Sequence, residues 1–153
     1  MSEIRIQHDD FDPGTEIAAI QSTAGDVGAI ASFIGIVRAD GKMQAMTLDH
    51  YPGFAEREIA THVAEARTRW PLLGVRVVHR VGRLVPGERI VFVGVASSHR
   101  GAAFAAAEFL MDYLKTRAPF WKLEERENGG TWVEARDSDD ESVKRWRPMI
   151  DKI

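Results

Sequence analysis

The stretch RIVFVGVASSHRGAAFAAAEFLMDYLKTRAPFWKLE, from Arg89 to Glu124, decides the fold. It opens with RIVFVGVAS, a nearly continuous apolar run with β-branched residues, which predicts a strand covered along much of its length. Ser97 or Ser98 can cap the alanine-rich helix that follows. Pro119 disfavours helix in the residue before it, so the helix must end there and a further strand begins. The stretch therefore predicts a strand, a long helix and a second strand in direct succession.

Apolar spacing on either side of this stretch predicts the remaining elements. They are a strand around Ile4 and Ile6, a helix from Pro13, strands over 28–38 and 43–51, a helix that ends at Trp70, strands over 75–84, 120–125 and 131–136, and a final helix capped by Asp137 or Ser138. One hairpin would join the strands over 28–38 and 43–51 through Asp40-Gly41, and a second would turn at 128–130. Helices mixed with hairpins indicate an α+β fold with a mixed, largely antiparallel sheet and flanking helices.

The composition describes one globular domain. A chain of 153 residues has the length of a single domain, and 44% hydrophobic with 28% charged residues excludes disorder and fibrous repeats. The formal net charge of −3 gives no overall positive field for nucleic acid, so any anion site must be local. The start, MSEIRIQHDDFD, has neither a basic nor an apolar leader segment, and no apolar run has the roughly 20 residues that span a bilayer. We therefore expect a cytoplasmic protein.

The absence of cysteine is the most restrictive feature of the composition. It excludes disulfides, thiolate metal sites, a cysteine nucleophile and a persulfide carried by the protein itself. The histidines at 50, 62 and 79 lack ligand spacing, and the acidic run 137–141 lacks the glycine of a calcium loop, so no metal site is expected. If the protein handles sulfur, something else must carry it.

The segment Ser97-Ser98-His99-Arg100-Gly101 joins a strand to a helix and puts two potential cations in the first helical turn. A helix N-terminus already carries about half a positive charge, so an arginine there costs about 0.3 to 1 kcal/mol unless an anion is bound. This placement indicates an anion pocket. The alternative, of about equal weight, is an arginine paired with a surface carboxylate and a histidine satisfied by the backbone.

Two lysines and a further arginine are the other candidates. Lys115 falls in the last turn of the predicted helix, where the helix dipole favours a cation, so its position alone favours a structural role. Lys122 follows Phe120-Trp121, and partial burial there would fit it to act as a nucleophile or acid–base group; a solvated strand lysine is the alternative. Arg38 ends an apolar strand, where a ligand contact and an ordinary strand-end charge are equally expected.

Several long segments resemble the catalytic large subunit of molybdopterin synthase, of the MoaE type. The resemblance is carried by VGRLVPGERIVFVGVASSHRGAAF (Val81 to Phe104) and FLMDYLKTRAPFWKLE (Phe109 to Glu124). It extends to ASFIGIVRAD, LDHYPGF, RWPLLGVRVVHR and GTWVEAR, so it covers nearly the whole chain. It implies a single MoaE-like domain over 1–153 with an α/β hammerhead fold, in which the first hairpin would form a small subdomain at roughly 38–52.

The resemblance also implies an activity and partners. The family forms a homodimer that binds a small ubiquitin-like sulfur carrier of the MoaD type at each end, giving a heterotetramer. The carrier's Gly-Gly tail ends in a thiocarboxylate, enters the large subunit's pocket and delivers two sulfurs, in two rounds, to cyclic pyranopterin monophosphate. The product is the dithiolene of molybdopterin, so the chain would be a sulfurtransferase of molybdenum cofactor biosynthesis without a cofactor of its own. This agrees with the absence of cysteine, because the sulfur arrives on a partner.

Carried over residue by residue, the resemblance marks two groups of positions. The catalytic positions are Lys115 and Lys122, and the substrate-binding positions are Ile36, Val37, Arg38, His99, Arg100, Leu123 and Glu124. Lys115 would assist addition and elimination at the attacked carbon, and Lys122 would support proton transfer.

The basic residues among the substrate-binding positions would hold the ligand. Arg38, His99 and Arg100 would bind the cyclic phosphate and the pterin of the substrate. Ile36 and Leu123 stand where relatives often have basic residues, so their backbones rather than their side chains would line the pocket.

Two other classes of function stay open from the sequence. The chain could be a non-catalytic anion-binding or scaffold module that kept the fold; retention of both lysines favours catalysis over this reading. It could also be an enzyme that forms a lysine Schiff base with its own carbonyl substrate, which borohydride trapping would reveal.

Overall fold

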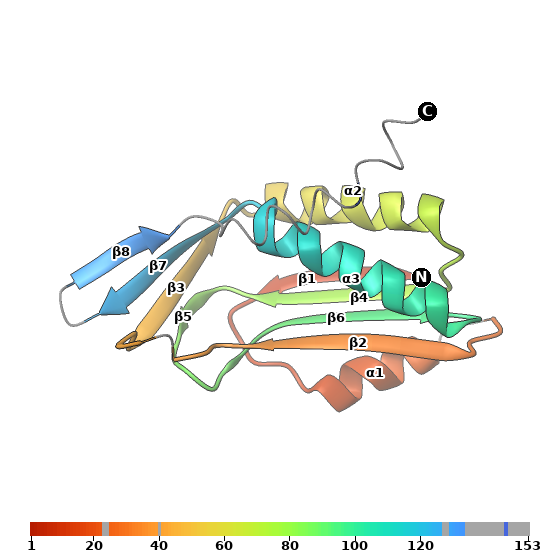
Figure 1. Ribbon diagram of the computed structural model, residues 1–153, viewed down its shortest axis with the longest axis horizontal. Coiled ribbons are helices and arrows are strands. Elements are labelled where there is room, and N and C mark those ends of the chain that lie inside the picture. The colour runs from red at the N-terminus through yellow and green to blue at the C-terminus, as the bar shows by residue number, and fades with distance from the viewer. Residues whose placement is uncertain (23–24, 40, 127–128, 134–145, 147–153) are drawn as a thin grey trace.

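The computed structural model describes residues 1–22, 25–39, 41–126, 129–133 and 146. Its elements are β1 (Ser2–Gln7), α1 (Pro13–Gln21), β2 (Ala29–Ile36), β3 (Ala45–His50), α2 (Phe54–Arg69), β4 (Gly74–Arg80), β5 (Gly82–Leu84), β6 (Arg89–Ser97), α3 (Arg100–Thr116), β7 (Phe120–Arg126) and β8 (Gly129–Val133) (Figure 1). The helix predicted from Pro13 begins there because the Asp12 carboxylate accepts a hydrogen bond from the Thr15 amide at 3.2 Å. The predicted α+β class is confirmed.

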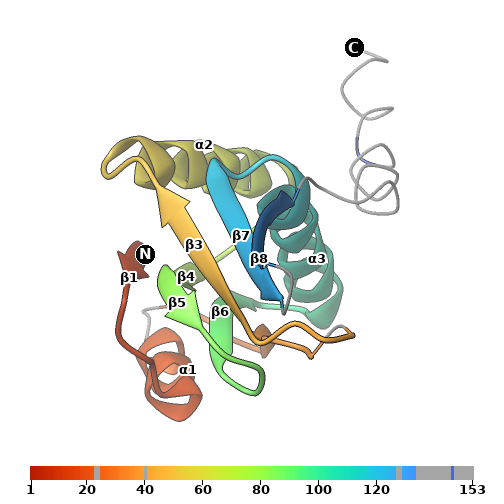
Figure 2. The ribbon, with the colours of Figure 1, turned by 90° about the vertical axis from the view of Figure 1, so that its left-hand side faces the viewer.

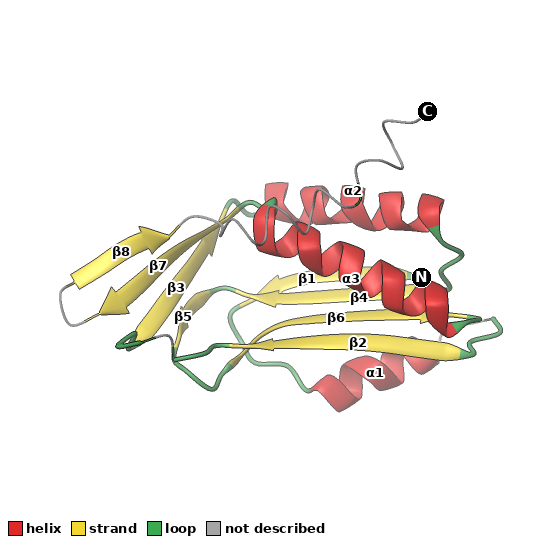
Figure 3. Ribbon diagram, viewed as in Figure 1, coloured by secondary structure: helices red, strands yellow, loops and turns green. Residues whose placement is uncertain are grey.

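One four-stranded sheet forms the body of the molecule, in the order β1-β4-β6-β2. β1 runs parallel to β4, and β6 is antiparallel to both of its neighbours. Helices α2 and α3 lie over one face of this sheet and α1 lies under the other (Figure 3). The strands β4 and β6 are therefore covered on both faces, which explains their nearly continuous apolar sequences.

A second four-stranded sheet, in the order β5-β3-β7-β8, lies at one end of the first (Figure 2). Its strands pair antiparallel throughout. The predicted hairpin between 28–38 and 43–51 is wrong, because β2 pairs with β6 whereas β3 pairs with β5 and β7. An apolar pattern fixes which face of a strand is buried, but it does not fix which strand lies beside it.

The predicted strand over 75–84 also divides between the two sheets. β4 ends at Arg80 in the first sheet and β5 begins at Gly82 in the second. Gly82 has a φ of 92°, and a Cβ there would lie 2.8 Å from Nδ1 of His8, so the break needs glycine. The predicted pairing of the strands on either side of 128–130 is confirmed as β7 with β8, but β8 begins at Gly129, so Gly129 and Gly130 lie in the strand and not in the turn. The predicted helix from Asp137 or Ser138 lies outside the described residues.

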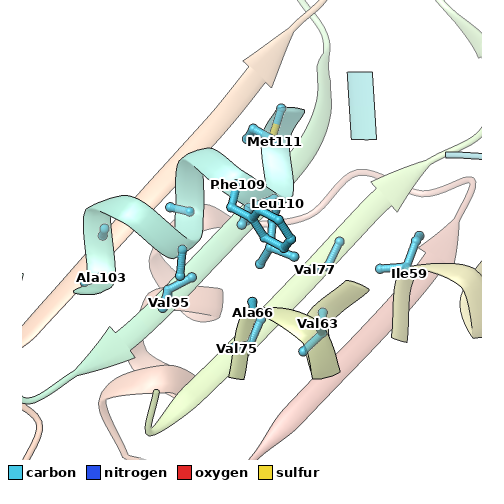
Figure 4. Packing of buried hydrophobic residues seen from close by; sticks show 14 of the residues in the cluster. Ile59, Val63, Ala66, Val75, Val77, Val95, Ala103, Phe109, Leu110 and Met111 are labelled. Atoms are coloured by element: carbon cyan, nitrogen blue, oxygen red, sulfur yellow. The ribbon is translucent and has the colours of Figure 1, made fainter. Parts of the chain in front are cut away.

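The main core fills the space between the first sheet and the two helices above it (Figure 4). Val75 and Val77 of β4 point into it, and Leu110 of α3 packs there while 2% exposed. A second cluster joins the two sheets and consists of Val37, Met43, Met46, Leu48, Val81 and Leu84. Phe120 packs against both clusters, so this ring links the body of the molecule to the second sheet.

Candidate functional site

The corner between α3 and β7 carries both candidate lysines. Lys115 lies in the last turn of α3 and Lys122 is the third residue of β7. The helix ends when the Tyr113 carbonyl accepts the Ala118 amide at 3.1 Å, and the Phe120 amide then donates to the Ala118 carbonyl at 2.8 Å. These two bonds turn the chain sharply at Pro119, as the sequence predicts. The structure thus places the two lysines on the two arms of one tight corner.

Lys122 is half-buried beside a carboxylate. Its Nζ lies 3.6 Å from Oε1 of Glu124, and Oε2 of Glu124 lies 2.7 Å from Nη2 of Arg126. Alternation along β7 puts these three side chains on one face, and Glu124 is 7% exposed. A buried carboxylate shared by two cations orients both of them, so Glu124 holds Lys122 in place. Lys122 is partly buried, and its acidic partner is Glu124, which the resemblance marked as a substrate-binding position.

Leu123 is placed differently from its two neighbours in β7. The alternation that unites Lys122 and Glu124 puts the Leu123 side chain on the opposite face of the strand, beside Thr47 of β3. The structure therefore does not bring this side chain to Lys122. Trp121 lies on the same face of β7 as Leu123. Its ring contacts the ring of Tyr51 edge to face, with 5.0 Å between the ring centroids.

A buried histidine lies beneath the corner. His79, at the end of β4, is 7% exposed, and its ring stacks on Phe120 with 4.1 Å between centroids and 16° between planes. Its Nδ1 lies 2.8 Å from the Arg80 carbonyl oxygen. Burial, joined by the charges of Lys115 and His50, lowers the pKa of His79 to about 4, against the opposing effect of the hydrogen bond with the Arg80 carbonyl. Metal-ligand spacing does not single out this histidine, whereas its position two residues after Val77 in an apolar strand indicates that it is buried.

This histidine makes stability depend on pH in a predictable direction. The folded pKa of about 4 lies below the ordinary 6.5, so between these values only the unfolded chain binds the proton. The free energy of unfolding should therefore fall as pH drops from 6.5 to 4, by up to about 1.4 kcal/mol per pH unit. Urea unfolding at several pH values would measure it. His79→Phe should remove this component of the slope, and an identical slope in both proteins would contradict the assignment.

The segment that carries Ile36, Val37 and Arg38 is anchored at its middle residue. The Val37 amide donates to the Glu88 carbonyl at 2.8 Å, and the Gly87 amide donates to the Val37 carbonyl at the same distance. Val37 is buried in the cluster against which Phe120 packs, whereas Ile36 is 57% exposed and Arg38 is exposed. Shared packing thus connects this segment with the α3–β7 corner.

His99 and Arg100 lie at the other end of α3 from Lys115. His99 is the N-cap residue, its side chain makes no capping bond, and the first turn contains no acidic residue. Both side chains are exposed. This is the local arrangement expected of an anion pocket. At 1.5 Å per residue, however, Arg100 and Lys115 are about 22 Å apart along the helix. One copy of the chain does not bring these residues together.

A close backbone contact fixes the N-terminus of α3. The Gly28 amide donates to the Ser97 carbonyl at 3.0 Å, and a Cβ on Gly28 would lie 2.1 Å from the Ser98 carbonyl oxygen. The segment before β2 is therefore packed directly against the turn that presents His99.

Gly28→Ala should lower the free energy of unfolding by about 1 to 3 kcal/mol, because the new methyl group meets backbone that must move. Gly101→Ala is the matched control, since a Cβ there has nothing within 4 Å and alanine favours helix. The control should keep or slightly raise stability. Urea unfolding of both variants measures the difference, and equal stabilities would refute the contact.

Two further observations concern the residues that the structure describes. Among them, no group of three or more histidine, aspartate or glutamate side chains is arranged to hold a metal ion. None of the helices in that same part of the chain is long and apolar enough to cross a membrane.

Comparisons with known proteins establish the family of this chain. The family model described as MoaE protein matches residues 6–117. The molybdopterin synthase catalytic subunit of Mesorhizobium japonicum is 55% identical over 147 residues, covering 94% of this chain and 92% of that protein. The solved MoaE protein of Burkholderia ambifaria MC40-6 has a TM-score of 0.84 and 51% identity, covering 95% of this chain and 98% of that one. A chain in the complex of subunits 1 and 2 of molybdopterin-converting factor from Helicobacter pylori 26695 shares the fold, with a TM-score of 0.71 and 21% identity over 88% and 90% of the two chains. This chain belongs to the MoaE family.

Proposed function

We propose that this chain is the catalytic subunit of a molybdopterin synthase, acting as one domain. In this role it transfers two sulfurs from the thiocarboxylate tail of a small carrier subunit to cyclic pyranopterin monophosphate. The observation that carries the proposal is the α3–β7 corner, which holds Lys115 and Lys122 on adjacent arms with Glu124 behind the second lysine. Relatives about half identical over nearly their whole length are named as this subunit, which supports it.

The two lysines have different surroundings and therefore different roles. Lys122 is 34% exposed and paired with the buried Glu124, so it is a fixed cation that can stabilise negative charge and exchange a proton with the substrate. Lys115 is exposed at the end of the helix, where its amine can assist addition and elimination at the attacked carbon.

The substrate pocket requires a second copy of the chain. The separation of about 22 Å along α3 prevents His99 and Arg100 from reaching the lysines of their own protomer. In a homodimer, the α3 N-terminus of one protomer can supply the anion-binding groups to the α3–β7 corner of the other. The substrate's cyclic phosphate would then lie against His99 and Arg100, with its reacting carbons at the lysines.

The sulfur must come from a partner. A chain without cysteine has no thiol on which to carry it as a persulfide. The related fold from Helicobacter pylori was solved as a complex of two subunits, which supports a small carrier protein in this role. The resemblance to the MoaE family implies that the carrier's tail ends in a Gly-Gly thiocarboxylate.

The test is a reconstitution. The purified protein is mixed with cyclic pyranopterin monophosphate and a carrier ending in Gly-Gly thiocarboxylate, and molybdopterin is measured as its oxidised fluorescent derivative. Product with this carrier, and none with the same carrier ending in an ordinary carboxylate, would support the proposal. A folded dimer that binds the carrier but forms no product would favour a binding module. A covalent adduct trapped by borohydride with a small carbonyl compound would favour a Schiff-base enzyme.

A further inference from the structure

We propose that His79 is a positioning residue for the two lysines: its ring is the platform on which Phe120 packs, and this packing sets Lys115 and Lys122 relative to each other. The inference rests on the proposed function, because it concerns the same site. It adds a residue from β4, in the body of the molecule, to a site otherwise built from the corner and the adjoining loops.

The platform is held rigidly. β4 is an inner strand of the first sheet, and His79 is paired with Ile6 of β1 on one side and Val91 of β6 on the other. Its Nδ1 lies 2.8 Å from the Arg80 carbonyl oxygen, an acceptor, so the proton must be on Nδ1 and the ring cannot rotate without breaking this bond. Backbone pairing and a side-chain hydrogen bond together fix both the place and the plane of the ring.

Phe120 transmits that position to the lysines. It is five residues after Lys115 and two residues before Lys122, on the same face of β7 as Lys122. It is also the ring that packs against both apolar clusters, the main core and the one that joins the sheets. A shift of this ring would therefore move β7, which carries Lys122, relative to α3, which carries Lys115. Displacements of about 1 Å are enough to slow an enzyme about 100-fold.

The charge state of the His79 ring follows from its burial and its charged neighbours. Lys115 of α3 and His50 of β3 are the titratable groups whose charges act on His79. A protonated imidazole would place another cation beneath the lysine corner, and burial disfavours this by lowering the pKa of His79 to about 4. His79 is therefore uncharged during turnover and contributes a flat hydrogen-bonded surface rather than a proton. An aromatic ring without nitrogen can replace most of that surface.

Four variants test the role in the reconstitution assay with the complete dimer and carrier. His79→Phe keeps a flat ring and should retain kcat within about threefold of wild type. His79→Asn keeps a donor near the Arg80 carbonyl but loses the stack, and should lower kcat about 10- to 100-fold with little change in KM. Phe120→Leu should have a similar effect, and the combined His79→Asn, Phe120→Leu variant should be no slower than its slower parent. The pH dependence of kcat should keep its shape in all of them.

Val77→Ala is the matched control, because Val77 is fully buried on the same strand and the same face but lies in the main core. It should lose stability while keeping kcat. If it loses kcat as much as His79→Asn does, His79 is merely structural and the inference is wrong. If the His79→Phe protein is as slow as His79→Asn, and the acid side of its kcat-versus-pH curve is shifted, then His79 itself transfers protons and the inference is wrong. Wild-type protein without activity would overturn the proposed function and this inference with it, whereas active wild type and unaffected His79 variants would overturn this inference alone.

Discussion

Lys115→Ala is expected to lower kcat for molybdopterin formation by at least about 100-fold, since positioned acid–base groups contribute roughly 10²- to 10⁴-fold to catalysis. The fold should survive, because Lys115 is exposed in the last turn of α3 and alanine is the best helix former. Loss of a cation near the helix C-terminus should cost no more than about 1 kcal/mol of stability. The reconstitution assay gives kcat, and urea unfolding gives the stability of the same preparation.

Arg117→Ala supplies the matched control for Lys115. Arg117 is also basic and exposed, lies two residues further along the same turn, and has no part in the proposed chemistry. Its removal should change kcat by no more than about twofold, which separates the loss of a specific amine from the loss of local positive charge. Lys115→Arg adds a second comparison, because it keeps the charge but cannot give up a proton near neutral pH. Full turnover by Lys115→Ala would show that Lys115 is not a catalytic residue.

Much of the fold follows from local sequence signals, and the α3–β7 corner shows why. Pro119 must end the helix, and the β-strand pattern resumes at once, so the positions of Lys115 and Lys122 on two adjoining arms are readable from a dozen residues. Strand partners are not readable in this way. The 28–38 and 43–51 segments look like a hairpin, yet β2 gains eight paired residues against β6 and leaves β3 to the other sheet.

Some features of the candidate site can also be predicted from local sequence, whereas others depend on contacts between residues far apart in the chain. Lys122 and Glu124 share a face because strands alternate, which any reader of the sequence can infer. The stack of His79 on Phe120 joins residues 41 positions apart across two sheets, and no local pattern contains it. The distance between Arg100 and Lys115 lies between these cases. Helix geometry alone gives about 22 Å, but only the assignment of both residues to one pocket turns that distance into an argument for a second protomer.

Subunit mixing should therefore restore activity between two inactive proteins. One carries Lys115→Ala, and the other carries both His99→Ala and Arg100→Ala, which removes charge-assisted contacts worth about 1.5 to 3 kcal/mol each. We expect each site to combine the lysines of one protomer with the α3 N-terminus of the other. In a mixed dimer, one site then contains all three substitutions, and the other site contains only wild-type residues. Random reassembly makes half of the dimers mixed, so activity should return to about a quarter of wild type.

A mixture of Lys115→Ala with Lys122→Ala is the control that makes the recovery interpretable. Both lysines lie on the same α3–β7 corner of one protomer, so every site in the mixed dimer lacks one of them and activity should stay absent. If each protomer instead held a complete site, neither mixture would recover, because each site would keep its own defect. Recovery in the first mixture alone is thus the outcome that a pocket shared between protomers requires. If neither mixture recovers activity while mass spectrometry confirms subunit exchange, the pocket is not shared between protomers. His99 and Arg100 would then act only within their own protomer.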